Sequence, residues 1–107
     1  MDNLGQFCQA LIENRYCKLI DLDLSKCNIT SESARPLIKL LNSKYKLRHL
    51  NLKDNAIRDN AASELLNALL NYNCFITKLN MEYNPIKHQI FKDIETQTKQ
   101  NILKVNE

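Results

Sequence analysis

The chain has almost no glycine or proline and no tryptophan: its 107 residues hold one Gly, Gly5, and two Pro, Pro36 and Pro85. This scarcity excludes a collagen-like composition and a Gly/Pro-rich linker. No apolar run approaches the roughly 20 residues that a membrane-spanning helix requires. The opening residues MDNLGQFCQ have neither the basic flank nor the apolar core of a secretory leader. We therefore expect one folded domain, located in the cytoplasm and without a membrane as partner.

A strong charge of one sign is also missing. Fifteen basic residues stand against twelve acidic ones, which gives a net charge of +3. The densest basic stretch, SKYKLRH, alternates Lys44, Lys46 and Arg48 with other residues and is typical of a solvated turn between two elements. The composition therefore does not predict nucleic acid as a partner.

The four cysteines are dispersed and include no CxxC pair: they are Cys8, Cys17, Cys27 and Cys74. This spacing excludes the dense disulfide framework of small secreted domains, so we expect reduced thiols. A zinc site of three of them, Cys8, Cys17 and Cys27, with His49 would contain no close ligand pair. The sequence predicts no metal site.

What the chain does contain is a pattern, LxxLxLxxNxI, that occurs three times. The copies begin at Leu19, Leu47 and Ile76, so the second interval is just one residue longer than the first. Repetition at this period is typical of solenoids, in which each unit is too small to bury its apolar face without neighbours. The matching positions are Leu19, Leu22, Leu24, Cys27 and Ile29; Leu47, Leu50, Leu52, Asn55 and Ile57; and Ile76, Leu79, Met81, Asn84 and Ile86.

Each copy begins with the pattern of a short strand. The last three positions of LxxLxL alternate between apolar and polar, as in a strand with one buried face. In the second copy, Leu50 and Leu52 should point into the core, while His49 and Asn51 point outward. Successive strands must be parallel, because a helical pattern separates them.

The Asn position follows each strand. An Asn side chain can donate and accept hydrogen bonds where the backbone bends away from the sheet. Asn55 and Asn84 should therefore form a ladder between neighbouring repeats, and the smaller, weaker donor Cys27 takes this place in the first copy.

Helical patterns follow the strands at residues 33–41 and 62–70, and Ser31 and Asp59 are the expected N-caps. Residues 2–14 and 87–101 also have helical patterns and are expected to cap the two ends. The core-facing residues of the middle helices are predicted to be Leu37, Leu40 and Leu41, and Leu66, Leu69 and Leu70. The predicted central core comprises Leu22, Leu24, Leu50, Leu52, Leu79 and Met81 with Leu37, Leu40, Leu66 and Leu69.

The last residues, ILKVNE, begin a fourth strand pattern that is not completed. Ile102, Leu103 and Val105 are apolar and favour strand structure. They are expected either to fold back on the edge of the last strand or to contact a partner there.

These repeats resemble leucine-rich repeats of the ribonuclease-inhibitor-like class, which have 28- and 29-residue units and Cys or Asn at the ninth position. The resemblance implies an α/β fold: a short right-handed solenoid with parallel strands on the concave face, helices on the convex face, and helical caps at both ends. The class often has Gly near the helix start, where this chain has Ser33 and Ala61, so these turns must adopt negative φ or accept strain. The predicted segments of a single domain, 1–107, are a capping helix 1–18, repeats 19–46, 47–75 and 76–101, and a tail 102–107.

The resemblance implies little about function, because the class includes inhibitors, cytoskeletal caps, GTPase activators and immune sensors. We predict a non-enzymatic protein–protein interaction module, either a scaffold or a structural subunit of a larger assembly. The alternatives are a cytoskeletal or axonemal component with cytoskeletal or ciliary location, a tropomodulin-like actin-associated cap, and a GTPase-activating protein. For the last, Arg35 and Arg58 are candidates by neighbourhood only.

The outward positions of the predicted strands supply the candidate binding face. His49 lies between Asp21 and Lys78 in one row, but an open row of solvated polar residues explains this trio better than catalysis does. We predict no catalytic residue and no cofactor. The candidate partner-binding residues are Asp21, Asp23, Arg48, His49, Asn51, Lys78, Asn80 and Tyr83.

Overall fold

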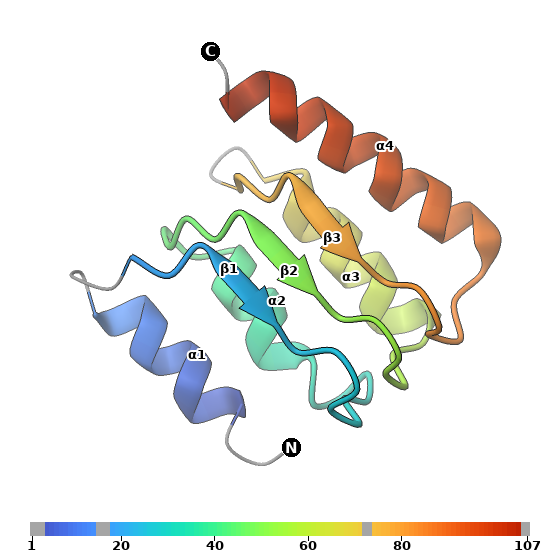
Figure 1. Cartoon of the computed structure of the whole chain (residues 1–107), viewed down its shortest axis with the longest axis horizontal. Coiled ribbons are helices and arrows are strands. Elements are labelled where there is room, and N and C mark those ends of the chain that lie inside the picture. The colour runs from blue at the N-terminus through green and yellow to red at the C-terminus, as the bar shows by residue number, and fades with distance from the viewer. Residues whose placement is uncertain (1–3, 15–17, 72–73, 106–107) are drawn as a thin grey trace.

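The computed structural model describes residues 4–14, 18–71 and 74–105. Helices and strands alternate along the chain (Figure 1). No helix among the described residues is long and apolar enough to cross a membrane. The elements are α1 (Leu4–Glu13), β1 (Asp21–Asp23), α2 (Arg35–Leu41), β2 (His49–Asn51), α3 (Asp59–Leu69), β3 (Lys78–Asn80) and α4 (His88–Val105).

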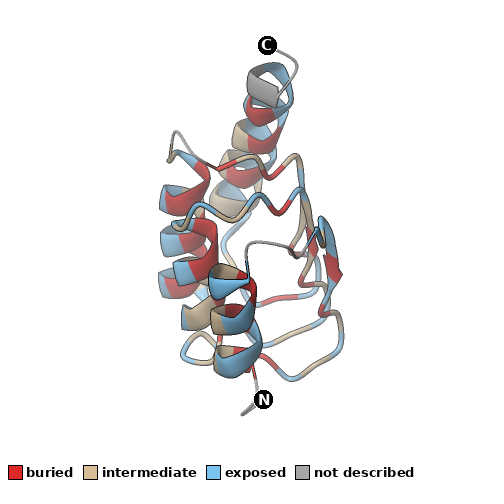
Figure 2. Ribbon diagram, turned by 90° about the vertical axis from the view of Figure 1, so that its left-hand side faces the viewer, coloured by how far each residue is buried: buried red, intermediate tan, exposed pale blue. Residues whose placement is uncertain are grey.

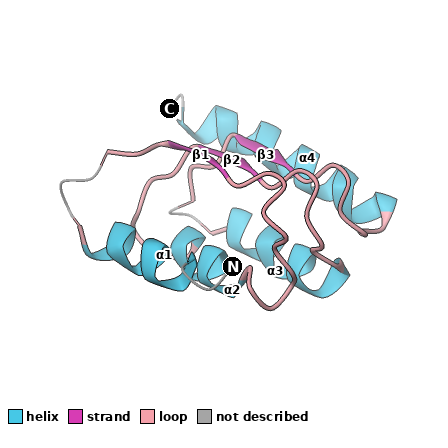
Figure 3. Ribbon diagram, turned by 60° about the horizontal axis from the view of Figure 1, so that its bottom comes forward, coloured by secondary structure: helices cyan, strands magenta, loops and turns pink. Residues whose placement is uncertain are grey.

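The three strands form one parallel sheet in the order β1-β2-β3. The register follows the sequence repeat, because Asp21 pairs with His49 and His49 pairs with Lys78. Helices α1, α2 and α3 pack side by side in a second layer beneath the sheet (Figure 3). Helix α4 contacts both α3 and β3 and runs beside the last strand (Figure 1). The helices therefore leave the other face of the sheet open.

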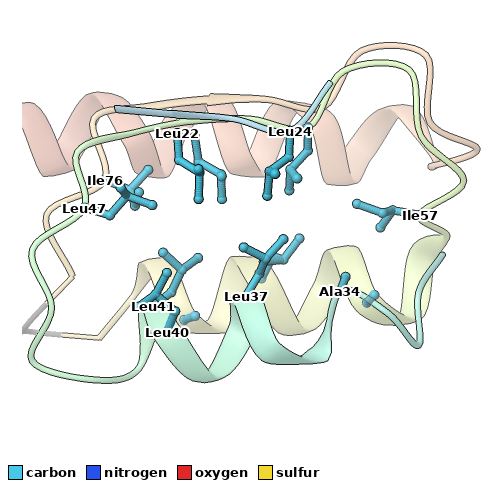
Figure 4. Packing of buried hydrophobic residues seen from close by; sticks show 14 of the residues in the cluster. Leu22, Leu24, Ala34, Leu37, Leu40, Leu41, Leu47, Ile57 and Ile76 are labelled. Atoms are coloured by element: carbon cyan, nitrogen blue, oxygen red, sulfur yellow. The ribbon is translucent and has the colours of Figure 1, made fainter. Parts of the chain in front are cut away.

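The core lies between the two layers, and Figure 2 shows buried residues on the facing sides of helices and strands. Leu22 and Leu24 point from the strand layer toward Leu37 and Leu41 of α2 (Figure 4). Of the predicted central core, all but two residues are buried. Leu66 and Leu79 are partly buried and pack against the core.

The predicted Asn bridges between repeats are confirmed. Asn55 Oδ1 accepts bonds from the N–H groups of Cys27 and Ile29, both at 3.0 Å. Its Nδ2 donates to the carbonyls of Leu24 and Leu52, also at 3.0 Å. Each side chain therefore bonds to the backbone of two repeats, rather than to the next Asn side chain.

Asn84 makes three of these four bonds one repeat later. Its Oδ1 accepts from Ile57 N–H at 3.0 Å, and its Nδ2 donates to Leu52 O at 2.9 Å and Met81 O at 3.0 Å. In the first repeat the Cys27 thiol donates to Ser25 O at 3.3 Å, which is a contact within its own turn.

The predicted core face of α3 was wrong by one residue. The buried leucines are Leu65 and Leu69, while Leu70 is 59% exposed. Helix α3 follows α2 at the shorter of the two repeat intervals, so Leu65 corresponds to Leu37. The extra residue of the longer interval lies after the helix, where Leu70 occupies the C-cap position.

The predicted N-caps Ser31 and Asp59 were also wrong. Thr30 and Ser33 exchange reciprocal bonds at the turn before α2, Thr30 N–H to Ser33 Oγ at 2.7 Å and Ser33 N–H to Thr30 Oγ1 at 3.2 Å. Ser31 Oγ instead accepts from Arg58 N–H at 2.9 Å, and Asp59 Oδ1 accepts from Lys87 N–H at 2.8 Å. Both side chains therefore connect neighbouring repeats instead of capping their own helices.

Three residues at the same place in successive repeats adopt left-handed backbone, and a fourth lies near the first of them. The residues are Lys26 (φ 54°), Asp54 (φ 59°), Tyr83 (φ 60°) and Asn28 (φ 56°). Ser33 and Ala61 are not among them, so the helix starts accommodate non-glycine residues without positive φ. The unfavourable backbone lies instead at the turn that follows each strand.

Residues 102–105 do not form the expected fourth strand, because α4 continues through them to Val105. Asn101 attaches α4 to the rest of the fold. The residue is 1% exposed, and its Nδ2 donates to Ile76 O at 3.0 Å and Leu69 O at 3.4 Å. Ile102 and Leu103 are exposed on the last turns of α4. Cys17 and the Val105 side chain lie outside the described part of the structure.

Leu50→Ala should lower the free energy of unfolding by about 2–5 kcal/mol, because Leu50 is 2% exposed at the centre of the sheet. Leu70→Ala removes the same atoms from an exposed position and should cost less than about 0.5 kcal/mol. Urea unfolding followed by circular dichroism measures both. Equal losses for the two variants would contradict the described core.

Asp54→Val should lower the free energy of unfolding by about 1–2 kcal/mol, because a β-branched residue resists left-handed backbone. Asp54→Gly should change it by less than about 1 kcal/mol, because relief of strain offsets the greater freedom of the unfolded chain. Chemical denaturation compares the two substitutions. If valine were tolerated as well as glycine, the positive φ of this turn would be wrong.

Candidate functional site

The open face of the sheet begins with a row of three side chains in register, Asp21, His49 and Lys78. His49 Nδ1 lies 3.5 Å from Asp21 Oδ2, and these side chains are 36% and 72% exposed. Such an exposed contact between side chains contributes little to the stability of a fold.

The next row, Asp23, Asn51 and Asn80, has a structural role that the sequence did not reveal. In each case the side-chain oxygen accepts the backbone N–H of the residue two positions later. The distances are 2.9 Å from Ser25 N to Asp23 Oδ1, 3.0 Å from Lys53 N to Asn51 Oδ1, and 3.0 Å from Glu82 N to Asn80 Oδ1. These turns end the strands and fix the side chains at the carboxyl edge of the sheet.

Five of the six residues of these two rows line a shallow hollow of about 250 Å³. It brings together five of the eight candidate residues and omits Asp23, Arg48 and Tyr83. Its lining is Asp21, His49, Leu50, Asn51, Lys78 and Asn80. The hollow is open, and the His49 side chain in it is 36% exposed.

Arg48 and Tyr83 lie at opposite ends of the strands. Arg48 directly precedes β2, and its carbonyl accepts from Thr77 N–H at 2.9 Å. Tyr83 is 72% exposed after β3, and Lys53 Nζ lies 5.4 Å from the centroid of its ring. The sequence repeat could have revealed this cation–π pair, because Lys53 and Tyr83 occupy neighbouring outward positions of adjacent repeats.

The tail candidates lie at another surface. A hollow of about 620 Å³ separates the outer edge of β3 from α4, and Ile102 lines it together with Phe91 and Ile94. Its charged lining residues are of both signs, and Lys99 Nζ lies 3.3 Å from Glu95 Oε1. Leu103 is 68% exposed but does not line this hollow.

Of the described cysteines, Cys8 is buried and Cys27 is half-buried, and both are reduced thiols. Burial raises the pKa of the Cys8 thiol to about 11. At neutral pH this thiol is protonated and is therefore a poor nucleophile. Within residues 4–14, 18–71 and 74–105, no group of three or more His, Cys, Asp or Glu side chains is arranged to hold a metal ion.

Comparison with known proteins gives matches to repeat proteins. A family model described as "Leucine Rich repeat" matches residues 17–37 and 46–66. The NACHT, LRR and PYD domains-containing protein 9 of Bos taurus is 33% identical over 78 residues, which is 73% of this chain and 8% of that protein. The ribonuclease inhibitor of Mus musculus is 36% identical over 63 residues, 59% of this chain and 14% of that protein. The chain thus spans less than a fifth of the length of these relatives.

A solved structure shares the fold across nearly the whole chain. It is the C-terminal domain of tropomodulin from Caenorhabditis elegans, with a TM-score of 0.55 and 14% sequence identity. The match covers 98% of this chain and 78% of that chain. At this identity the similarity concerns the arrangement of helices and strands alone.

Asp23→Asn should remove an acid-dependent part of the stability while keeping the turn, since Asn51 and Asn80 make the same turn. Two hydrogen bonds from Ser25 lower the pKa of Asp23 below its ordinary value of 3.8: the hydroxyl bond has the larger effect and the backbone N–H bond the smaller one. Its carboxylate therefore stabilises the fold above that value, and this stabilisation is lost as the pH falls through the lower, folded-state pKa.

Urea unfolding at about pH 6 and about pH 2.5 measures how much unfolding free energy is lost on acidification. This loss should be larger in the original chain than in Asp23→Asn. Ser25→Ala is the matched control: it removes the hydroxyl bond but keeps the N–H bond, and should give an intermediate pH dependence. An identical pH dependence in all three proteins would show that this turn does not favour the carboxylate.

Proposed function

Because this chain belongs to the leucine-rich-repeat family, in its ribonuclease-inhibitor-like class, we propose that it is a non-enzymatic protein–protein interaction module. Within this proposal it serves as a scaffold or structural subunit of a larger cytoplasmic assembly. The partner is a protein, and it docks on the open face of the sheet.

The observation that carries the proposal is the order of the polar side chains on that face. Asp23, Asn51 and Asn80 are fixed by their own turns, and Asp21 and His49 lie within 3.5 Å of each other. Side chains that are already ordered lose little entropy when a partner docks. Arg48 and Tyr83 add the residue types that contribute most to protein interfaces.

The same proposal includes the finer architecture. The chain would form a right-handed solenoid, the hand that crossover connections between parallel strands favour. Its repeats would begin at residues 19, 47 and 76, and α1 and α4 would cap its two ends. The contacts of α1 with α2, and of α4 with α3 and β3, support the positions of these caps.

A second contact surface, at Ile102 and Leu103, belongs to the proposal as an alternative docking position. Both side chains are exposed on α4, and Ile102 lines the hollow beside β3. The tropomodulin-like fold agrees with a cytoskeletal role as well as with a general scaffold. The identity of the partner distinguishes these roles.

The open-face triple variant His49→Ala/Lys78→Ala/Tyr83→Ala should weaken partner binding by at least about tenfold, or 1.4 kcal/mol. A photo-crosslinking residue at the exposed Lys78 identifies the partner, and calorimetry with the purified partner measures the affinity. The control Glu64→Ala/Asn67→Ala changes exposed residues of α3, on the opposite layer, and should leave the affinity within about twofold.

Loss of binding in the α3 control, with unchanged binding in the open-face variant, would place the interface on the helices. Unchanged binding in both variants would favour the α4 surface, which Ile102→Ser/Leu103→Ser tests in the same assay. Turnover of any substrate that His49→Ala abolished would contradict the non-enzymatic assignment.

A further inference from the structure

At one end of the two layers, where the helices connect to the strands (Figure 3), the connecting segments carry basic side chains without acidic ones. Among residues 18–20, 42–48, 70–71 and 74–77 there is no acidic side chain. The opposite end, at residues 24–34, 52–58 and 81–87, has nearly balanced charge, with Lys26, Lys53, Arg58 and Lys87 among Glu32, Asp54 and Glu82. The basic residues at the helix-to-strand end are Lys18, Lys44, Lys46 and Arg48.

A groove of about 580 Å³ lies among three of these basic residues. Its walls come from the end of α1, the residues directly before β1 and the connection between α2 and β2. Ile20 is 49% exposed, and Ile12 and Leu19 are partly buried, so the groove offers apolar surface to a ligand. We call it the basic groove and define it by Ile12, Leu19 and Ile20 with Lys18, Lys44 and Lys46.

Hydrogen bonds fix the walls of the basic groove. The Tyr45 hydroxyl donates to Leu19 O at 2.6 Å, which joins the second connection to the first. The Ser43 hydroxyl donates to Leu40 O at 2.6 Å and accepts from Tyr45 N–H at 3.1 Å. Lys46 Nζ is held 5.1 Å from the centroid of the Phe75 ring. These contacts hold the described residues of the second connection against Leu19, which lowers the entropic cost of binding there.

We propose that the basic groove binds an acidic segment of a protein partner, with an apolar side chain of that segment seated on Ile12, Leu19 and Ile20. The groove lining contains three lysines and no acidic residue, so it attracts carboxylates of the partner that lie on either side of this apolar side chain. The inference rests on the proposed function, that of a protein-binding module, but concerns a surface separate from the open face of the sheet.

The structure favours an acidic peptide over a nucleic acid. Single-stranded nucleic acids bind to proteins by stacking their bases on exposed aromatic rings. Tyr45 is half-buried with its hydroxyl bonded to Leu19, and Lys46 lies over the ring of Phe75. The groove also differs from the hollow beside β3, where Lys99 and Glu95 form an ion pair and the lining has no excess of either sign.

A fluorescent peptide in which Asp and Glu residues flank a central Leu-Phe pair tests this proposal by anisotropy on the complete chain. We expect saturable binding that weakens by at least about tenfold when the pair is replaced by Ser-Ser or when Lys44 and Lys46 are both changed to Glu. The matched control, Lys87→Glu/Lys92→Glu, changes the net charge equally at exposed positions elsewhere. It should leave the affinity within about twofold.

Ile20→Ser separates the apolar contact from the charge and should weaken binding of the Leu-Phe peptide without affecting the Ser-Ser peptide. Equal losses from the groove and control charge reversals would show general charge attraction and overturn the proposal. Absence of binding, or tighter binding of an oligothymidine of equal charge, would also overturn it. Because the variants of the basic groove differ from those of the open face, this inference can fail while the proposed function stands.

Discussion

The side-chain amides of Asn55 and Asn84 are the contacts on which the rest of the structure depends. Each amide bonds to backbone groups of its own repeat and of the one before it. These backbone groups lie where the chain leaves the sheet, and a buried polar group without a partner costs about 1–3 kcal/mol. A shift of one repeat against the next would leave several such groups unpaired. The amides therefore fix the register of the strands, and the register in turn aligns Asp21, His49 and Lys78 on the open face.

The sequence predicts the strands, their parallel order and their register because one side-chain pattern recurs with a nearly constant period. It predicts the helices less accurately. The longer second interval shows that one residue has been added but not where, and the phase of α3 depends on that position. Since the addition follows the helix, Leu65 rather than Leu66 is buried, and Leu70 is turned to solvent.

The roles of Ser31 and Asp59 were missed for a related reason. An oxygen near a helix start can cap that helix or bond to a neighbouring repeat, and only the packing decides between them.

The candidate surfaces also combine features that the sequence repeat predicts with features that depend on the three-dimensional structure. The rows of the open face follow directly from the repeat, so their members were predictable, whereas the local turns of Asp23, Asn51 and Asn80 required the backbone geometry. The basic groove was not predictable from any single motif. It combines the end of α1 with two connections that lie in successive repeats, and a bond from Tyr45 to Leu19 brings them together. Lysines that look like an ordinary solvated turn in the sequence therefore surround an apolar hollow in the structure.

The last described residues form a helix despite a local strand preference. Asn101 precedes residues that favour a strand in isolation. Its amide instead donates to the carbonyls of Leu69 and Ile76, one at the end of α3 and one before β3. These bonds hold α4 against both layers, and the helix then continues through Ile102 and Leu103. The buried amide of Asn84 at a turn and that of Asn101 in α4 thus meet the same requirement, that buried polar groups remain paired.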